Sequence, residues 1–120
     1  MHELTIALSL IETVCDELPA LGNGARVAVL HVRLGPLSSV VPEALALSFD
    51  LAASGSALPG ARLEIERSPL VIWCDRCVAE RTAPSVLRLA CPVCGSTGST
   101  VVAGRELELA AVEVVGAARF

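Results

Sequence analysis

The chain has no lysine, no tyrosine and only two histidines among its 120 residues. Its nine cationic side chains are all arginines scattered along the chain, and 13 acidic residues outweigh them, giving a net charge of −4. Nucleic-acid binding by counterion release needs a basic face, so this balance argues against a nucleic-acid partner. The longest charge-free run, 89–104, is too short and too polar to span a bilayer, which argues against a membrane partner.

The N-terminal sequence also lacks an export signal. Met1-His2-Glu3 provides no basic n-region, and Glu12 interrupts the apolar run that follows. We therefore predict a cytoplasmic protein with reduced thiols. A length of 120 residues predicts one domain, or one small domain with an inserted module.

Four of the five cysteines form two Cys-x-x-Cys pairs, Cys74/Cys77 and Cys91/Cys94, with thirteen residues between the pairs. Two residues between ligands let one short turn direct both sulfurs at one ion, and two such turns complete a tetrahedron that Zn²⁺ usually occupies. Disulfide stapling is the alternative, but it requires an oxidising compartment. Neither histidine is near the pairs. The sequence therefore predicts an all-thiolate structural zinc site with no open position for water, and no enzymatic activity.

Hydrophobic periodicity predicts an α+β fold. We expect a helix over 3–18, a strand over 25–34, a helix over about 42–53, a strand over 61–67 and a strand over 105–115. Two helices are predicted to cover one face of this three-stranded sheet, with a zinc-ribbon-like module inserted before the last strand. The predicted domains are 1–69 with 101–120, which form the α/β domain, and 70–100, which binds zinc.

The residue patterns also predict which side chains are buried. Apolar stripes are expected on the first helix (Leu4, Leu8, Ile11, Cys15, Leu18, widened by Ile6, Leu10, Val14) and on the second (Leu45, Phe49, Ala52, widened by Ala44, Leu47, Leu51). The opposite sheet face is expected to be solvated, with charges paired across strands (His31, Arg33, Glu64, Glu66, Glu106, Glu108). His31 is predicted to be a surface or edge residue. The last strand is expected to change phase at Ala110-Ala111, where a bulge or bend would fit.

A second candidate metal site lies at the N-terminus. A free α-amine, the amide nitrogens of His2 and Glu3, and the His2 imidazole can surround one ion in a four-nitrogen plane. This geometry favours Ni(II) or Cu(II) over Zn. A histidine at position 2 alone does not decide between a metal site and an incidental residue.

The order of motifs along the chain adds information. Met1-His2-Glu3-Leu4 opens the first helix, and it is followed by Val32-Arg33-Leu34-Gly35-Pro36-Leu37-Ser38, Pro42-Glu43-Ala44-Leu45, Leu63-Glu64-Ile65-Glu66-Arg67, Trp73-Cys74, Cys91-Pro92-Val93-Cys94-Gly95-Ser96 and Gly104-Arg105-Glu106-Leu107. Over essentially its whole length the chain resembles the hydrogenase nickel-incorporation metallochaperones of the HypA/HybF family.

The resemblance implies a nickel metallochaperone that delivers Ni(II) during maturation of [NiFe] hydrogenase; some relatives also serve urease. It implies that Met1, His2 and Glu3 bind nickel as cargo, and that the four paired cysteines bind a structural zinc. The implied partners are a nickel-binding GTPase and the large-subunit precursor of the hydrogenase. A zinc-ribbon adaptor that only binds protein, with His2 incidental, is the alternative.

The chain departs from the family pattern at two positions. Arg33 stands where many relatives carry Glu, and Val93 stands where many carry His inside the second cysteine pair. The region 70–100 contains no histidine. The all-thiolate set is therefore retained as the prediction for the zinc site.

Overall fold

The computed structural model describes residues 2–21 and 25–116. The chain divides into two compact units. Unit 1 comprises Met1–Val32, Val40–Glu66 and Leu109–Phe120, and unit 2 comprises Arg33–Ser39 and Arg67–Glu108. The cysteine module predicted over 70–100 lies inside unit 2. The assignment of nickel and zinc to separate domains stays a prediction.

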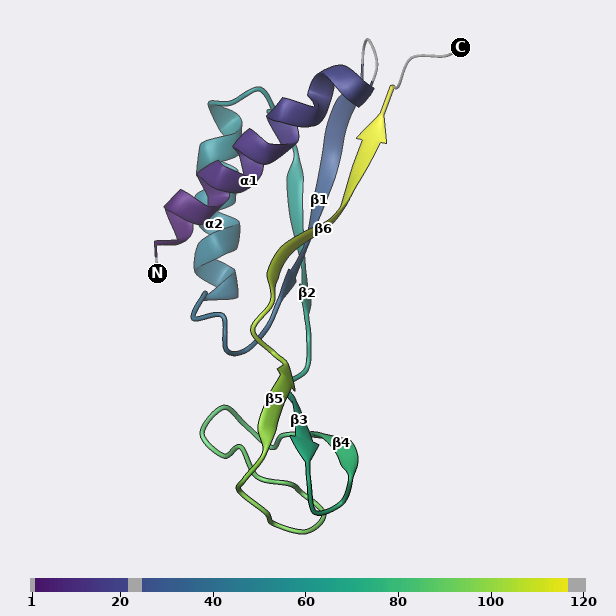
Figure 1. The fold of residues 1–120 in the computed structure, drawn as a ribbon. Helices are drawn as coiled ribbons and strands as arrows, with labels where there is room; N and C mark the ends of the chain where they lie inside the picture. Colours follow the sequence, from purple (N-terminus) through teal and green to yellow (C-terminus); the bar gives the residue numbers. More distant parts are fainter. Residues whose placement is uncertain (1, 22–24, 117–120) are drawn as a thin grey trace. The chain divides into compact units, whose positions relative to one another are not determined.

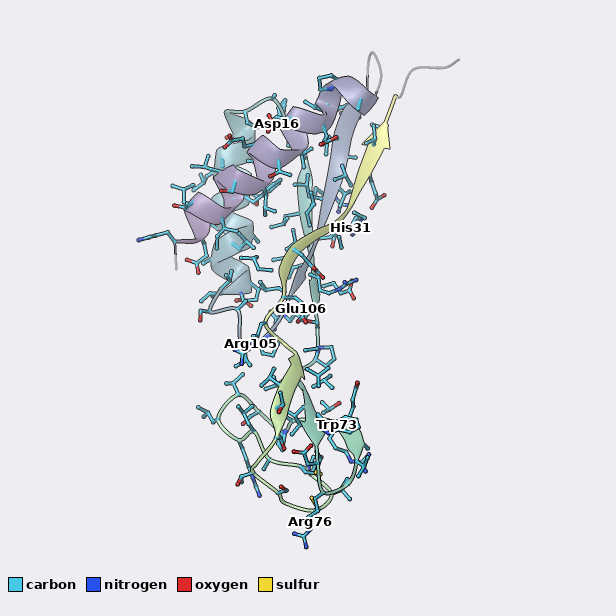
Figure 2. The ribbon with its side chains drawn as sticks, viewed as in Figure 1. Asp16, His31, Trp73, Arg76, Arg105 and Glu106 are labelled. Carbon is cyan, nitrogen blue, oxygen red and sulfur yellow. The ribbon has the colours of Figure 1, made fainter. Side chains whose placement is uncertain are left out.

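Unit 1 contains two helices that pack against each other, α1 (Glu3–Glu17) and α2 (Pro42–Ser54), and a 3-10 turn, η1 (Leu18–Leu21), follows α1. Pro42 occupies the first turn of α2 and Gly55 follows its last residue, as the sequence predicts. Both helices lie on the same side of the neighbouring sheet (Figure 1). The buried helical positions are Ala7, Ile11 and Val14 on α1, and Leu45, Phe49 and Ala53 on α2.

Part of the predicted helical stripes is wrong. Leu4 and Leu8 of α1 are about half exposed, and Leu47 and Leu51 of α2 are more exposed still. Apolar residues occur on almost every side of these helices, so periodicity alone does not select the buried face. Instead, the buried face of each helix includes an alanine, Ala7 on α1 and Ala53 on α2. Among the described residues, neither helix combines the length and apolar content needed to cross a bilayer.

The three predicted strands form one sheet in the order β2-β1-β6, with bounds Arg62–Arg67, Arg26–Leu34 and Leu107–Val115. The predicted α+β fold class is thus confirmed. Burial along β6 alternates up to Leu109, passes through two exposed alanines, and resumes in the other phase at Val112. The predicted phase change is confirmed. The strand begins at Leu107, two residues later than expected.

Cross-strand charge pairs are present on this sheet, but the predicted set needs correction. In unit 2, Arg33 Nη1 lies 3.0 Å from Glu108 Oε1. In unit 1, His31 Nε2 contacts Glu113 Oε2. Because β1 is the central strand, His31 is a surface histidine, with 36% of its side chain exposed, and not an edge one. Its partner Glu113 was not in the predicted charged face.

Glu106 is also misplaced by the sequence prediction, since it does not lie on a solvated strand face. It is partly buried just before β6, where it accepts a hydrogen bond of 2.6 Å from Ser68 Oγ. The Gly104 amide donates to both carboxylate oxygens, at 2.9 and 3.1 Å. These donors, Ser68 first, hold the pKa of Glu106 below its ordinary value. Through these hydrogen bonds Glu106 connects Ser68 to the turn at Gly104 within unit 2.

Unit 2 has its own antiparallel sheet, in the order β4-β3-β5. The bounds are Val71–Cys74 for β3, Ala79–Thr82 for β4 and Thr100–Ala103 for β5. Leu70, Ile72 and Ala83 form a small buried cluster, against which Leu37, Leu89 and Val101 pack. This core is small, so a further crosslink would contribute much to its stability.

Candidate metal centre

The two cysteine pairs occupy turns at the ends of the unit 2 strands. Cys74 is the last residue of β3, and the turn through Cys77 leads directly into β4. Cys91 and Cys94 lie in the segment that precedes β5. Cys74 and Cys91 are buried, while Cys77 and Cys94 are partly buried. The fold therefore brings together the four cysteines that the sequence spacing selects.

The four sulfurs lie within 4.8 Å of one another. Cys74 Sγ is 3.5 Å from Cys94 Sγ, and Cys77 Sγ is 3.8 Å from Cys91 Sγ. A regular tetrahedron with zinc–sulfur bonds of about 2.3 Å has sulfur–sulfur edges of about 3.8 Å. The spacing and the all-sulfur donor set thus fit a structural zinc ion. All five cysteines lie among the described residues, and each is a free thiol.

Backbone amides support the first cysteine of each pair. The Cys77 amide donates to Cys74 Sγ at 3.4 Å, and the Cys94 amide donates to Cys91 Sγ at 3.5 Å. The latter bond is the main reason why the pKa of Cys91 is lowered to about 6. Hydrogen bonding with the Cys94 thiol is the main reason why the pKa of Cys77 is raised to about 11. Zinc binding displaces the protons from such thiols, so metal affinity and protonation are linked.

At the other candidate site, His2 is exposed and immediately precedes α1. Its side chain makes no capping hydrogen bond, while its carbonyl accepts the Ile6 amide at 3.2 Å. The carboxylate of Glu3 accepts the Val41 amide at 3.2 Å, which is the main cause of its lowered pKa. A Glu3 ligand would therefore be the backbone nitrogen. Met1, the third predicted nickel ligand, lies outside the described residues.

Comparison with known proteins places the chain in a family. The family described as "Hydrogenase/urease nickel incorporation, metallochaperone, hypA" matches residues 1–114. The chain belongs to the HypA family. The family description names a metallochaperone for nickel and not a catalyst, so the prediction that the chain is not an enzyme is confirmed. HypA proteins bind nickel, and the four-cysteine cluster of this chain fits structural zinc.

Similar HypA proteins come from several bacteria. "Hydrogenase maturation factor HypA" of Roseiflexus sp. is 49% identical over 113 residues, which cover 94% of this chain and 91% of that protein. The protein of the same name from Thermomicrobium roseum is 40% identical, over 95% of this chain and 98% of the relative. These matches identify a hydrogenase maturation factor, and such a factor works with other maturation proteins.

Solved structures show the same fold. The solution structure of the Ni metallochaperone HypA from Helicobacter pylori matches with a TM-score of 0.61 and 22% identity, covering 94% of this chain and 97% of that one. A second solution structure of a HypA protein gives a TM-score of 0.66, also at 22% identity, over 96% and 97% of the two chains. At this identity, the likeness supports the fold assignment of this HypA-family chain.

The two cysteine turns differ in backbone strain. After the second pair, Gly95 adopts a φ of +76°, which glycine tolerates. At the equivalent position after the first pair, Val78 adopts a φ of +52°. A left-handed conformation is unfavourable for a β-branched residue. The absence of glycine from the first turn, visible in the sequence, therefore corresponds to a strained residue in the structure.

Val78→Gly is expected to raise the thermal unfolding midpoint of the zinc-loaded protein. Relief of left-handed strain outweighs the entropy cost of glycine, for a net gain of about 0.5–1 kcal/mol. The Val78 side chain is 70% exposed, so its removal costs little apolar burial. Val93→Gly is the matched control, because Val93 is 68% exposed but has no positive φ. This control should lower the midpoint slightly. A lower midpoint for Val78→Gly would contradict the strain argument.

Proposed function

We propose that this HypA-family chain carries Ni(II) at its N-terminus and delivers it in the cytoplasm to the large-subunit precursor of a [NiFe] hydrogenase. A nickel-binding GTPase is the proposed partner in delivery, and urease is a further candidate recipient. The proposed nickel ligands are the Met1 amine, the His2 imidazole, and the amide nitrogens of His2 and Glu3. Cys74, Cys77, Cys91 and Cys94 are proposed to hold the zinc ion that stabilises unit 2.

The observation that carries the nickel proposal is the exposed His2 directly before α1. Its imidazole has no competing capping role. The Glu3 amide lies at the first position of the helix, where helix geometry offers no acceptor four residues back. Its proton can therefore be lost to nickel without breaking a helical hydrogen bond.

Electrostatics at the helix terminus also fits this ligand set. The positive end of a helix dipole opposes a bound cation. Two deprotonated amides cancel the double charge of Ni(II), so the four-nitrogen complex adds no net charge at the start of α1. The Glu3 carboxylate remains available for its hydrogen bond to Val41. A planar nitrogen set of this kind favours Ni(II) or Cu(II) over Zn.

Calorimetric titration with Ni(II) tests the proposal. Protein with a free N-terminal amine is expected to bind one nickel ion while it retains one zinc ion. His2→Ala should weaken nickel binding by more than about tenfold, or about 1.4 kcal/mol, because it removes the imidazole ligand. Zinc content should be unchanged in this variant, because the cysteine cluster lies in unit 2.

The second histidine provides the matched control for this titration. His31 contacts Glu113 on the sheet of unit 1, and His31→Ala should leave nickel affinity intact. A tag that converts the Met1 amine into an amide should weaken binding as His2→Ala does. Unchanged nickel affinity in His2→Ala would overturn the proposal as drawn.

A zinc-ribbon adaptor that only binds protein is the second candidate function. It is favoured by apolar side chains that unit 2 presents to solvent, among which Leu87 is 93% exposed and Val78 and Val93 are about two-thirds exposed. Exposed apolar side chains mark a protein-binding surface where they form a contiguous patch. The titration separates the two functions, because an adaptor would bind nickel equally well with and without His2.

A further inference from the structure

The register of the unit 2 sheet places one arginine on the same face as the zinc cluster. On the antiparallel β3–β4 pair, Arg81 lies opposite Ile72, and Ala79 lies opposite Cys74. Residues directly opposite each other, and residues two apart, share a face of a sheet. Arg81 is therefore on the face that Ile72 and Cys74 bury. It is partly buried, whereas its neighbours on β4, Glu80 and Thr82, are exposed.

One nitrogen of the Arg81 guanidinium is buried, although the residue as a whole is only partly buried. Its Nε is inaccessible to solvent and, among the described residues, has no hydrogen-bond partner. A buried N–H without an acceptor is costly, so such a group calls for an explanation. The pKa of Arg81 is raised, first by hydrogen bonding to the Cys77 sulfur and, less strongly, by the Cys91 sulfur.

A zinc ion with four thiolates carries a net charge of −2, and partial burial of that charge requires compensation. Backbone amides donate to Cys74 and Cys91, the first cysteine of each pair. Arg81 is the cationic side chain that the β3–β4 register places on the face of Cys74. We propose that Arg81 is a positioning residue of the zinc centre, donating N–H hydrogen bonds to the cluster thiolates and offsetting their negative charge.

This inference rests on the zinc site proposed above. An arginine suits the role because its planar, permanently charged fork can donate to two sulfurs at once, which a lysine ammonium does less well. Hydrogen bonds from such partners orient metal ligands and reduce the reactivity of thiolates toward electrophiles. Arg81 would therefore increase zinc affinity and protect the cluster from alkylation.

Zinc competition titration with a chromophoric chelator tests the proposal on the full-length protein. Arg81→Met, which keeps an unbranched apolar side chain but removes the donors and the charge, should lower zinc affinity by about 10–100-fold. Arg81→Lys should fall between Arg81→Met and the original protein. Arg88→Met is the charge-matched control, because Arg88 is exposed in the same unit, and it should leave affinity unchanged.

Two further measurements separate a role at the sulfurs from a general effect on folding. Alkylation of the four cluster cysteines by N-ethylmaleimide in the zinc-loaded protein should be faster in Arg81→Met than in Arg88→Met. Cobalt(II) substitution should show a shifted sulfur-to-cobalt charge-transfer band in Arg81→Met but not in Arg88→Met. A loss of stability with an unchanged charge-transfer band and an unchanged alkylation rate of the cluster cysteines would overturn the proposal.

The zinc titration also shows whether a failure lies in the zinc assignment or only in the role of Arg81. If the original protein binds no zinc, the metal assignment itself is wrong. If it binds one zinc ion and Arg81→Met binds it with equal affinity, only the role of Arg81 is wrong.

Discussion

Cys77→Ser is expected to release zinc and to unfold the strands of unit 2. A serine hydroxyl is a poor zinc ligand compared with a thiolate, and the remaining three sulfurs would hold the ion weakly. Structural zinc contributes about 10–16 kcal/mol of binding free energy in small zinc-finger peptides. Losing even part of this binding free energy would cost more stability than the small apolar cluster around Leu70 and Ile72 can supply.

Metal analysis and circular dichroism would measure this result. Zinc content should fall well below one ion per chain, while the helical signal persists, because α1 and α2 belong to unit 1. Cys94→Ser should behave like Cys77→Ser. Cys15→Ser is the control, since this partly buried thiol lies on α1 and should not affect zinc. Full zinc content in Cys77→Ser would show that the ligand set is wrong.

X-ray absorption at the zinc edge tests the donor set directly. The original protein should show four sulfurs at about 2.3 Å from zinc. No histidine lies in 70–100, so no imidazole from this module can replace a lost or protonated thiolate. The centre should therefore fail in mild acid by losing its metal. A mixed nitrogen and sulfur shell would show that His2, His31 or a second chain reaches the ion.

The local signals in the sequence predicted the elements of this fold well. Pro42 and Gly55 bracket α2 because each has a backbone preference that acts within its own turn. Alternation identified β1, β2 and β6, and it also predicted the phase change at Ala110-Ala111. The cysteine cluster was equally predictable, because the two-residue spacing within each pair is itself the ligand geometry.

The failures concern contacts between distant segments. Leu8 and Leu47 looked like core residues, but the partners that cover a helix are set by tertiary packing. Glu106 fitted the alternation of a strand, yet Ser68 and the Gly104 amide hold it in a turn before β6. The pairing of His31 with Glu113 required knowledge that β1 is central.

Arg81 was missed at the metal centre for the same reason. One arginine among nine has no local mark that places it beside a cysteine cluster. A weak signal was available, because Ala79-Glu80-Arg81-Thr82 begins two residues after Cys77, the last cysteine of the first pair. If that stretch returns as a strand beside Cys74, alternation puts Arg81 and Ala79 on one face. The β3–β4 register shows that this face is the buried one, because Arg81 lies opposite the buried Ile72.

Gly35→Ala is expected to destabilise the zinc-loaded protein by about 3 kcal/mol or more, a cost at the upper end for overpacking. A Cβ at Gly35 would lie 2.2 Å from the Gly104 carbonyl oxygen and 2.7 Å from Glu106 Oε1. The first of these atoms is backbone, so rotating a side chain cannot relieve the clash. Hydrogen bonds from the Gly35 amide to the Glu106 carbonyl, at 2.8 Å, and from the Leu37 amide to the Gly104 carbonyl, at 2.7 Å, hold the two segments together.

Denaturant unfolding of the zinc-loaded protein measures this loss, with Gly55→Ala as the matched control. Gly55 has no atom within 4 Å of an added Cβ, and its φ of −102° suits any residue. The control should therefore be neutral or stabilise slightly, because alanine reduces the entropy of the unfolded chain. If Gly35→Ala unfolds at the same denaturant concentration as Gly55→Ala, the segments 35–37 and 104–106 do not pack as closely as the structure shows. A large loss confined to Gly35→Ala would mean that unit 2 depends on this contact as well as on its metal.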